Sequence, residues 1–140
     1  MYGLFREIVK QNPDTLETKI SGLEKHHPAL YLKDTSSPDI AKEAFLSKGE
    51  IGHVHEELSL HLYFSAADAK EIIDKGWAER HPLAQRKPWG YPSRGEYPFG
   101  LGSTFLLVYG PRDFIELQVL KMMLRASARY MTGRQEVDFR

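Results

Sequence analysis

Residues 49–64 read GEIGHVHEELSLHLYF and hold three of the six histidines of the chain. Side chains alternate between the two faces of a β-strand, so His53 and His55 share one side and Val54 takes the other. The second half alternates as well: Leu60, Leu62 and Phe64 form an apolar side, and Ser59, His61 and Tyr63 form a polar side. The two runs are close enough in sequence to pair as a β-hairpin.

The register of this hairpin decides which side chains meet. A three-residue turn at 56–58 sets His55 opposite Ser59 and His53 opposite His61, and directly opposed residues share a sheet face. Three imidazoles then meet on one face. A two-residue turn would put His61 on the other face, because a slip of one residue inverts every side chain. The three-residue turn also buries Leu60, Leu62 and Phe64 beside Val54, so we predict that register.

Length and composition favour an ordinary globular protein. The 140 residues suit one domain with a core of its own, and 41% of them are hydrophobic. Lys and Arg together equal Asp and Glu at 19 each, so no basic surface favours nucleic acid. There is no cysteine, which removes disulfides, thiolate nucleophiles and cysteine-based metal sites.

No apolar run approaches the roughly 18 residues of a membrane span. The start of the chain also lacks the apolar region of a signal peptide. We therefore expect no membrane partner and a cytoplasmic protein. The sequence does not fix the oligomeric state, and a homodimer is compatible with it.

Outward from the hairpin, helix spacing and capping residues predict helices at 2–10, 39–47, 65–75 and 113–132. Alternation and β-forming residues predict strands at 16–20, 29–32 and 104–109 beside the hairpin. This order predicts an α+β single domain over residues 1–140. We expect a largely antiparallel sheet with helices on one face and the histidines on the other.

Several details follow from local patterns. Ser37 is expected to cap the second helix, with Pro38 at its first position. Phe45 and Phe114 are expected to face the core, and residues 135–140 are expected to be frayed.

Residues 84–102 form a long connection rich in proline, glycine and aromatic side chains. Loops of this length in compact domains often carry function, and the aromatic content argues against disorder. We interpret this segment as a lid over a pocket, with a packed surface loop as the alternative. Its aromatic side chains and one on the hairpin are the candidate substrate-binding residues: Tyr63, Trp89, Tyr91, Tyr97 and Phe99.

The three hairpin histidines admit three interpretations from spacing alone. They could ligate a metal ion, with Glu24 or His26 completing the site. They could do general acid–base work on a bound phenol, since histidine titrates near neutral pH. They could also simply hydrogen-bond the hairpin. The residues leave these alternatives open.

An ordered set of short motifs resembles the fungal luciferase family. The set reads Glu50-Ile51-Gly52-His53-Val54-His55, then Leu60-His61-Leu62, Ala67-x-Ala69-Lys70-Glu71, Lys75-Gly76-Trp77-x-x-Arg80-His81-Pro82-Leu83-Ala84 and Tyr109-Gly110-Pro111-Arg112-Asp113, before a helix ending Tyr130-Met131-Thr132. The run Ser21-x-Leu23-Glu24-x-His26-x-x-Ala29-Leu30-Tyr31 resembles the same family. The similarity covers about residues 15–133, and it is the order and spacing of the motifs that make it specific.

This resemblance implies cofactor-free oxygen chemistry. In the fungal luciferase, oxygen adds to a hydroxylated styryl-pyrone, an endoperoxide forms, and carbon dioxide leaves with light. The implied roles are acid–base catalysis by the histidines and Glu24, and an Arg80 that holds an anionic enolate or carboxylate. The catalytic set expected on these grounds is His53, His55, His61, His81, Arg80, Glu24 and His26, with no metal and no cofactor.

The chain also departs from the family. We expect no counterpart of the luciferase's N-terminal membrane-anchoring segment. The hairpin loop is shorter, and the 84–102 segment differs strongly in aromatic content. Light emission and the luciferase's own substrate are therefore not carried over. We expect a tailoring enzyme of secondary metabolism that oxygenates or decarboxylates a phenolic or pyrone polyketide, with O₂ as the possible partner. The alternatives are a non-redox cyclase, isomerase or dehydratase, and a non-catalytic binding protein.

Overall fold

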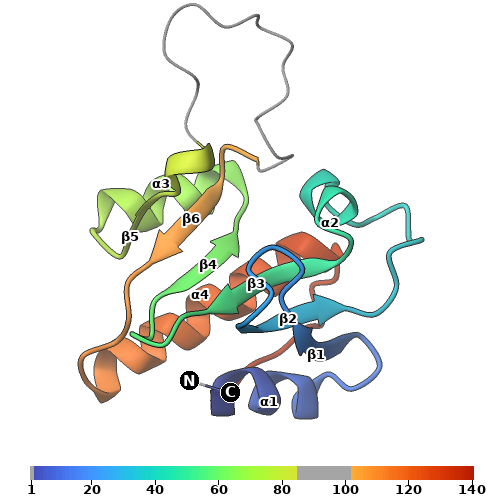
Figure 1. Ribbon diagram of the computed structural model, residues 1–140, viewed down its shortest axis with the longest axis horizontal. Helices are drawn as coiled ribbons and strands as arrows, with labels where there is room; N and C mark the ends of the chain where they lie inside the picture. The colour runs from blue at the N-terminus through green and yellow to red at the C-terminus, as the bar shows by residue number, and fades with distance from the viewer. Residues whose placement is uncertain (1, 85–101) are drawn as a thin grey trace, which may run out of the picture.

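Six antiparallel strands form one sheet in the order β1-β2-β3-β4-β6-β5 (Figure 1). The computed structural model describes residues 2–84 and 102–140. The strands are β1 Leu16–Ile20, β2 Pro28–Leu32, β3 Glu50–Val54, β4 Leu60–Tyr63, β5 Ala78–Arg80 and β6 Phe105–Val108. The helices are α1 Tyr2–Gln11, α2 Lys42–Leu46, α3 Ala66–Asp74 and α4 Phe114–Thr132, with a 3₁₀ turn at Pro82–Ala84.

The hairpin of β3 and β4 has the predicted register. His53 lies opposite His61 and Val54 lies opposite Leu60. The His55 N–H donates to the Ser59 carbonyl at 2.9 Å, which leaves residues 56–58 as the three-residue turn. Leu58 closes that turn at φ 75°, as expected where a turn ends in a left-handed residue. The prediction that fixed the histidine face is confirmed.

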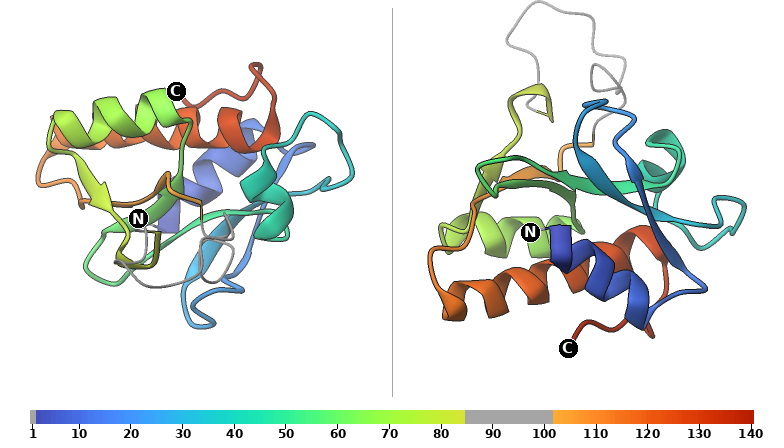
Figure 2. Two further views of the ribbon diagram at one scale, coloured as in Figure 1. Left: turned by 90° about the horizontal axis from the view of Figure 1, so that it is seen from above. Right: turned by 60° about the horizontal axis from the view of Figure 1, so that its bottom comes forward.

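The helices α1, α3 and α4 lie on one side of the sheet (Figure 2). The apolar side chains of β3 and β4 (Val54, Leu60, Leu62 and Phe64) are buried. The buried stripe of α4 includes Leu120, Met123, Leu124, Ala128 and Met131. This arrangement confirms the predicted α+β single domain. None of the helices in the described ranges is long and apolar enough to cross a membrane.

Strand β3 contains a bulge that changes which side chains share a face. The pairing with β2 runs Leu30 opposite Gly52 and then Tyr31 opposite Glu50, so Ile51 is an extra residue on β3. Residues three apart on a regular strand point to opposite faces. The bulge instead brings Glu50 to the same face as His53, and this pair organises the site.

Two helices carry the capping residues that were predicted. The Ser65 side chain accepts from the Asp68 N–H at the start of α3, and the Asp113 side chain accepts from the Glu116 N–H at the start of α4. Gly133 ends α4 in the left-handed region at φ 67°. β6 also lies inside the sheet, between β4 and β5, as its apolar sequence predicted.

Helix α2 departs from the prediction. It begins at Lys42 after Ala41, not after Ser37, and Ala41 makes no side-chain cap. The Ala41 N–H donates to the Met131 carbonyl at 3.2 Å, so a contact with the end of α4 holds the preceding residues out of the helix. Only Ala44 of α2 is buried, and the prediction that Phe45 faces the core is wrong. Phe114, the first residue of α4, is likewise exposed.

The prediction of a frayed C-terminus is also wrong. Val137 and Phe139 are 1% and 3% exposed and belong to the hydrophobic core. The Asn12 side chain fastens this segment to the end of α1: its amide donates to the Asp138 carbonyl at 2.6 Å, and its oxygen accepts from the Asp138 N–H at 3.1 Å. Val137 and Phe139, on either side of Asp138, pack into the core. The local sequence did not indicate that they are buried.

Candidate functional site

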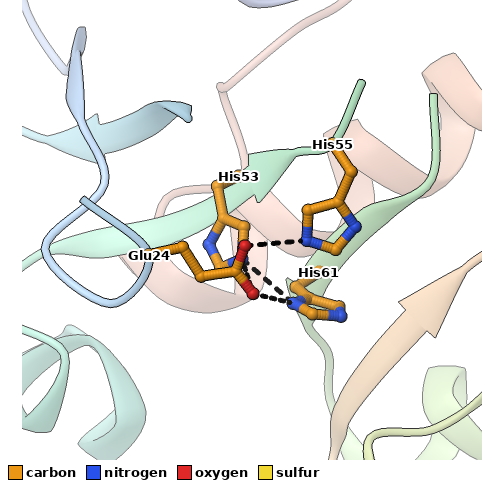
Figure 3. Close-up of side chains that lie close together, drawn as sticks. All are labelled: Glu24, His53, His55 and His61. Atoms are coloured by element: carbon orange, nitrogen blue, oxygen red, sulfur yellow. Dashed lines mark hydrogen bonds and ion pairs between the residues drawn. The ribbon is translucent and has the colours of Figure 1, made fainter. Parts of the chain in front are cut away.

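Four side chains converge on the sheet face opposite the large helices (Figure 3). His53 and His61 face each other from β3 and β4, His55 follows the end of β3, and Glu24 reaches over them from the β1–β2 connection. We call this set of four residues the His–Glu cluster. The cluster contains the three hairpin histidines that were predicted as site residues. Of the two candidates predicted upstream, Glu24 and His26, it contains Glu24.

The distances within the His–Glu cluster are short. His53 Nε2 lies 3.0 Å from His61 Nδ1. The Glu24 carboxylate lies 3.4 Å from His53 Nε2, 3.1 Å from His55 Nε2 and 3.6 Å from His61 Nδ1. His53 is 1% exposed, whereas the Glu24 side chain is 36% exposed. Glu24 is therefore the member that reaches solvent.

Ser21 explains why Glu24 sits over the imidazoles. Its hydroxyl accepts from the Glu24 N–H at 3.0 Å and from the Leu23 N–H at 3.2 Å, which shapes the turn after β1. The same hydroxyl donates to Glu50 Oε1 at 2.7 Å. The Ser21 N–H also donates to the His27 carbonyl at 2.8 Å and closes the turn. Ser21 thus hydrogen-bonds to both Glu24 and Glu50 and fixes their positions relative to each other.

Glu50 orients His53. Its Oε1 lies 2.8 Å from His53 Nδ1, and its Oε2 accepts from the Gly22 N–H and the Tyr31 hydroxyl, each at 2.8 Å. Burial raises the pKa of Glu50, but hydrogen bonds from His53, Ser21 and Tyr31 outweigh it and lower the pKa below the usual value. An ionised Glu50 only accepts hydrogen bonds, so His53 carries a proton on Nδ1 and turns Nε2 toward the cluster.

His55 is oriented by a second chain of hydrogen bonds. The Ser59 hydroxyl donates to Glu57 Oε1 at 2.6 Å and so accepts from His55 Nδ1 at 2.9 Å. The proton on Nδ1 leaves Nε2 bare in the neutral ring. His55 Nε2 is buried and makes no hydrogen bond in the described structure, although Glu24 Oε2 is 3.1 Å away. A bare Nε2 and a carboxylate oxygen are both acceptors, so this short contact is not a hydrogen bond.

His81 borders the cluster. The ring of His81 lies edge-on to that of His61 with 4.4 Å between centroids. Burial, followed by the neighbouring imidazoles, lowers the pKa of His61 to about 2. Burial also lowers the pKa of His81, partly opposed by Glu24. His61 is thus a neutral ring with an available lone pair.

His27, not its neighbour His26, contacts the cluster. His27 Nε2 lies 3.6 Å from Glu24 Oε2, and its ring is 5.3 Å from that of His55. His26 is exposed and takes no part in the contacts of the cluster. Lys25 adopts φ 42°, and this left-handed residue sets the direction of the two histidines after it. The role predicted for His26 has no support from its position.

Arg80 and Tyr63 also differ from the simple prediction. Arg80 is exposed and pairs with Leu106, which places it on the sheet face opposite His61. Tyr63 shares the face of His61 but is buried, with its ring 4.4 Å from that of Phe105. The remaining candidates, Trp89, Tyr91, Tyr97 and Phe99, lie outside the described residues, so their substrate-binding role stays a prediction.

A groove lies away from the His–Glu cluster. One groove of about 490 Å³ is lined by residues of the α3–β5 turn and the start of α4, including Lys75, Trp77 and Arg112. It contains no member of the His–Glu cluster. The volume of this groove therefore does not locate a catalytic site. Buried titratable groups, such as those of the His–Glu cluster, are the better guide.

Sequence reasoning missed three residues that build the site: Ser21, His27 and Glu50. Alternation places Glu50 on the wrong face, because the bulge at Ile51 depends on the pairing with β2. The one available signal was Glu50 itself, a charged residue inside an otherwise apolar strand. Such a residue is almost never fully buried without partners.

Comparisons with known proteins agree with the resemblance seen in the motifs. A family model described as the luciferase domain matches residues 48–127, more than half of the chain. Luciferases of Armillaria gallica and Armillaria mellea are each 34% identical over 137 residues, covering 90% of this chain and 47% of the relative. The luciferase of Neonothopanus nambi is 41% identical over 89 residues, covering 62% of this chain and 30% of the relative.

This chain spans about half the length of the Armillaria luciferases it matches. No solved structure matches it. The family model and the relatives together confirm the family predicted from the ordered motifs, and the match includes all three hairpin histidines. The chain belongs to the luciferase-domain family.

Proposed function

We propose that this protein is an enzyme that oxygenates or decarboxylates a phenolic or pyrone ring of the polyketide type in secondary metabolism. Support for the enzyme class comes from the luciferases it resembles. The observation that carries the proposal is the position of Glu24, a partly exposed carboxylate held against three nearly buried imidazoles. A ring hydroxyl that reaches Glu24 meets several proton acceptors at once.

The proposed reaction begins when the cluster takes the proton of a ring hydroxyl. The resulting enolate or phenolate is electron-rich, and a ring carbon adds O₂. The substrate supplies the electrons that reduce O₂ to the peroxide level. In a pyrone the peroxide bridges two ring carbons; the bonds from these carbons to the lactone group and the O–O bond then break, the lactone carbonyl and ring oxygen leave as carbon dioxide, and the two ring carbons become carbonyls. A phenol has no lactone group and would be oxygenated without this loss. Within this proposal Glu24 and His81 are the groups that touch the substrate, and Glu50 positions His53.

The structure gives Arg80 and His26 no place beside the cluster, so they are not part of this proposal. The light emission of the luciferases is not part of it either. The prediction that no cofactor takes part, the predicted cytoplasmic location and the compatible homodimer stay predictions.

The test is incubation of the protein with a panel of hydroxylated pyrones and phenolic polyketides, with and without O₂, followed by mass spectrometry. Oxygen incorporation or loss of carbon dioxide, dependent on O₂, is the expected result. Glu24→Gln should abolish turnover, because the amide cannot take the hydroxyl proton. His26→Ala is the matched control and should keep full activity, because His26 is exposed and outside the cluster.

Other outcomes would contradict the proposal in distinct ways. Turnover that continues at full rate under nitrogen would identify a cyclase, isomerase or dehydratase. Ligand binding without any mass change, in both gas phases, would identify a carrier.

A further inference from the structure

We propose that Glu24, His53, His55 and His61 together bind one divalent first-row transition-metal ion. The proposal goes beyond the reaction above and rests on geometry alone. It would also replace the sequence-based prediction of a metal-free site, since the histidines expected to move protons would then be ligands.

Bare lone pairs converge on one point in the His–Glu cluster. Glu50 holds the proton of His53 on Nδ1, and Ser59 holds the proton of His55 on Nδ1. The Nε2 atoms of both rings therefore carry lone pairs, and both lie within 3.4 Å of the Glu24 carboxylate. Lone pairs and a carboxylate repel each other at these distances unless a proton or a metal cation lies between them.

A proton does not resolve this arrangement as well as a metal ion. A proton on His61 Nδ1 would satisfy the 3.0 Å contact with His53 Nε2. It would leave His55 Nε2 facing Glu24, in an orientation that makes no hydrogen bond. One cation at the centre of the four donors satisfies both rings and the carboxylate together.

The distances between the donor atoms are close to those around a bound metal ion. Metal–nitrogen bonds of about 2.0–2.1 Å place neighbouring donors about 2.9–3.4 Å apart at octahedral or tetrahedral angles. The 3.0 Å between His53 Nε2 and His61 Nδ1 lies in that range. The two Glu24 oxygens divide the other contacts, Oε1 at 3.4 Å from His53 Nε2 and Oε2 at 3.1 Å from His55 Nε2, and both distances lie in the same range. All four donor atoms lie within 4.8 Å of one another, so a contraction of about an ångström completes the shell.

Hydrogen-bond partners behind two of the histidines resemble those behind metal ligands. Histidines that ligate a metal usually donate their other ring N–H to a carboxylate or another oxygen, which fixes the tautomer and the ring. Glu50 does this for His53, and Ser59 does it for His55. Glu50 is 1% exposed, and burying a carboxylate costs free energy. A role in orienting His53 as a metal ligand would explain why Glu50 is buried beside it.

Donor chemistry defines the class of ion. Imidazole nitrogens suit zinc, iron, nickel and copper, whereas calcium and magnesium prefer shells made of oxygen. Three histidines and one carboxylate leave room for a water or a substrate oxygen on the side where Glu24 reaches solvent. A deprotonated ring hydroxyl is the kind of oxygen that could bind there.

The test uses the full chain without a histidine tag, freed of metal with a chelator and titrated with Co²⁺. Binding is followed by calorimetry and by the visible absorption that Co²⁺ gains with nitrogen ligands. We expect one ion per chain. Glu24→Gln and His55→Ala should each weaken binding by more than about tenfold, since even loss of an outer-shell partner costs about 10- to 100-fold.

The matched controls are Glu56→Gln and His26→Ala, two exposed residues near the cluster in sequence that lie outside it. Both should bind Co²⁺ as the parent protein does. Circular dichroism of each variant shows whether it is folded, and Glu24→Gln keeps the test valid if His55→Ala unfolds, because Glu24 lies in an exposed turn. No saturable binding, or binding that all four variants share, would overturn the metal site. Substrate is absent throughout, so a missing enzymatic activity cannot be confused with a missing metal.

Discussion

The Glu50 carboxylate is almost fully buried and accepts four hydrogen bonds, from Ser21, Gly22, Tyr31 and His53. Each oxygen accepts two of them. The opposing effects on its pKa show how the residue stays ionised: burial favours the neutral acid, and the donors more than compensate. Burial, and after it the hydrogen bond to Glu50, raise the pKa of Tyr31 to about 12. This network is the foundation of the site.

Glu50→Gln is expected to destabilise the protein. An amide NH₂ in place of one carboxylate oxygen faces two donors, and the remaining hydrogen bonds lose their charge. We expect a loss of about 1–3 kcal/mol in the free energy of unfolding, measured by urea denaturation. Glu56→Gln is the control, because Glu56 is exposed in the same hairpin and should be neutral. Equal stability of the two variants would show that the Glu50 network is unimportant.

At the residue scale, alternation was sufficient to place His53 opposite His61, because one buried face fixes the register. It was insufficient for Glu50 and His27. Glu50 reaches its position through a bulge that depends on the pairing of β2 with β3. His27 reaches the cluster because Lys25 is left-handed in the turn after β1. Both depend on contacts and turn geometry that a single sequence does not display.

Gly52 is a point of close approach between β3 and β4. A Cβ at this position would lie 2.1 Å from the His61 carbonyl oxygen and 2.5 Å from Leu62 Cδ2. The carbonyl belongs to the backbone and cannot rotate away. Gly52 therefore permits the strand pairing that sets His53 opposite His61.

Gly52→Ala should destabilise the protein by about 1–3 kcal/mol, the usual cost of overpacking. The strain falls on the pairing of β3 with β4, so histidine ring signals in NMR spectra should shift as well. The matched control is Gly3→Ala in α1, where a Cβ meets nothing within 4 Å. That change should be neutral or stabilise the helix by up to about 1 kcal/mol. A neutral Gly52→Ala would mean that the strands lie farther apart than the structure places them.

At the scale of elements, prediction succeeded where a side chain signals its own role. Ser65 and Asp113 each accept a backbone N–H in the first turn of a helix, and Gly133 ends one in the left-handed region. It failed for α2, where Ser37 and Pro38 suggested a start that the contact between Ala41 and Met131 overrides. A long-range hydrogen bond outweighed a local preference, and sequence pattern has no access to such a bond.

Across the whole molecule, α1, α3 and α4 lie on one side of the sheet (Figure 2), and the side chains of the His–Glu cluster lie on the other (Figure 3). The C-terminal segment belongs to the helical side. The Lys121 ammonium lies 4.8 Å above the ring of Phe139 and also pairs with Glu7 at 3.0 Å. Phe139 and its neighbours therefore link α4 to α1, which explains why a segment that looks frayed in sequence is buried.

Phe139→Ala tests this link. Loss of a buried phenylalanine typically costs about 3–5 kcal/mol, and we expect a value near the lower end because a chain end can relax into the space. Gln135→Ala, an exposed change in the same segment, is the control. Denaturation in urea measures both, and a loss below about 0.5 kcal/mol for Phe139→Ala would restore the frayed interpretation. The sheet lies between Phe139 and the cluster, so Co²⁺ binding of the folded variant should match that of the parent. A simultaneous loss of metal affinity would instead show that the helical side holds the ligands in place through the sheet.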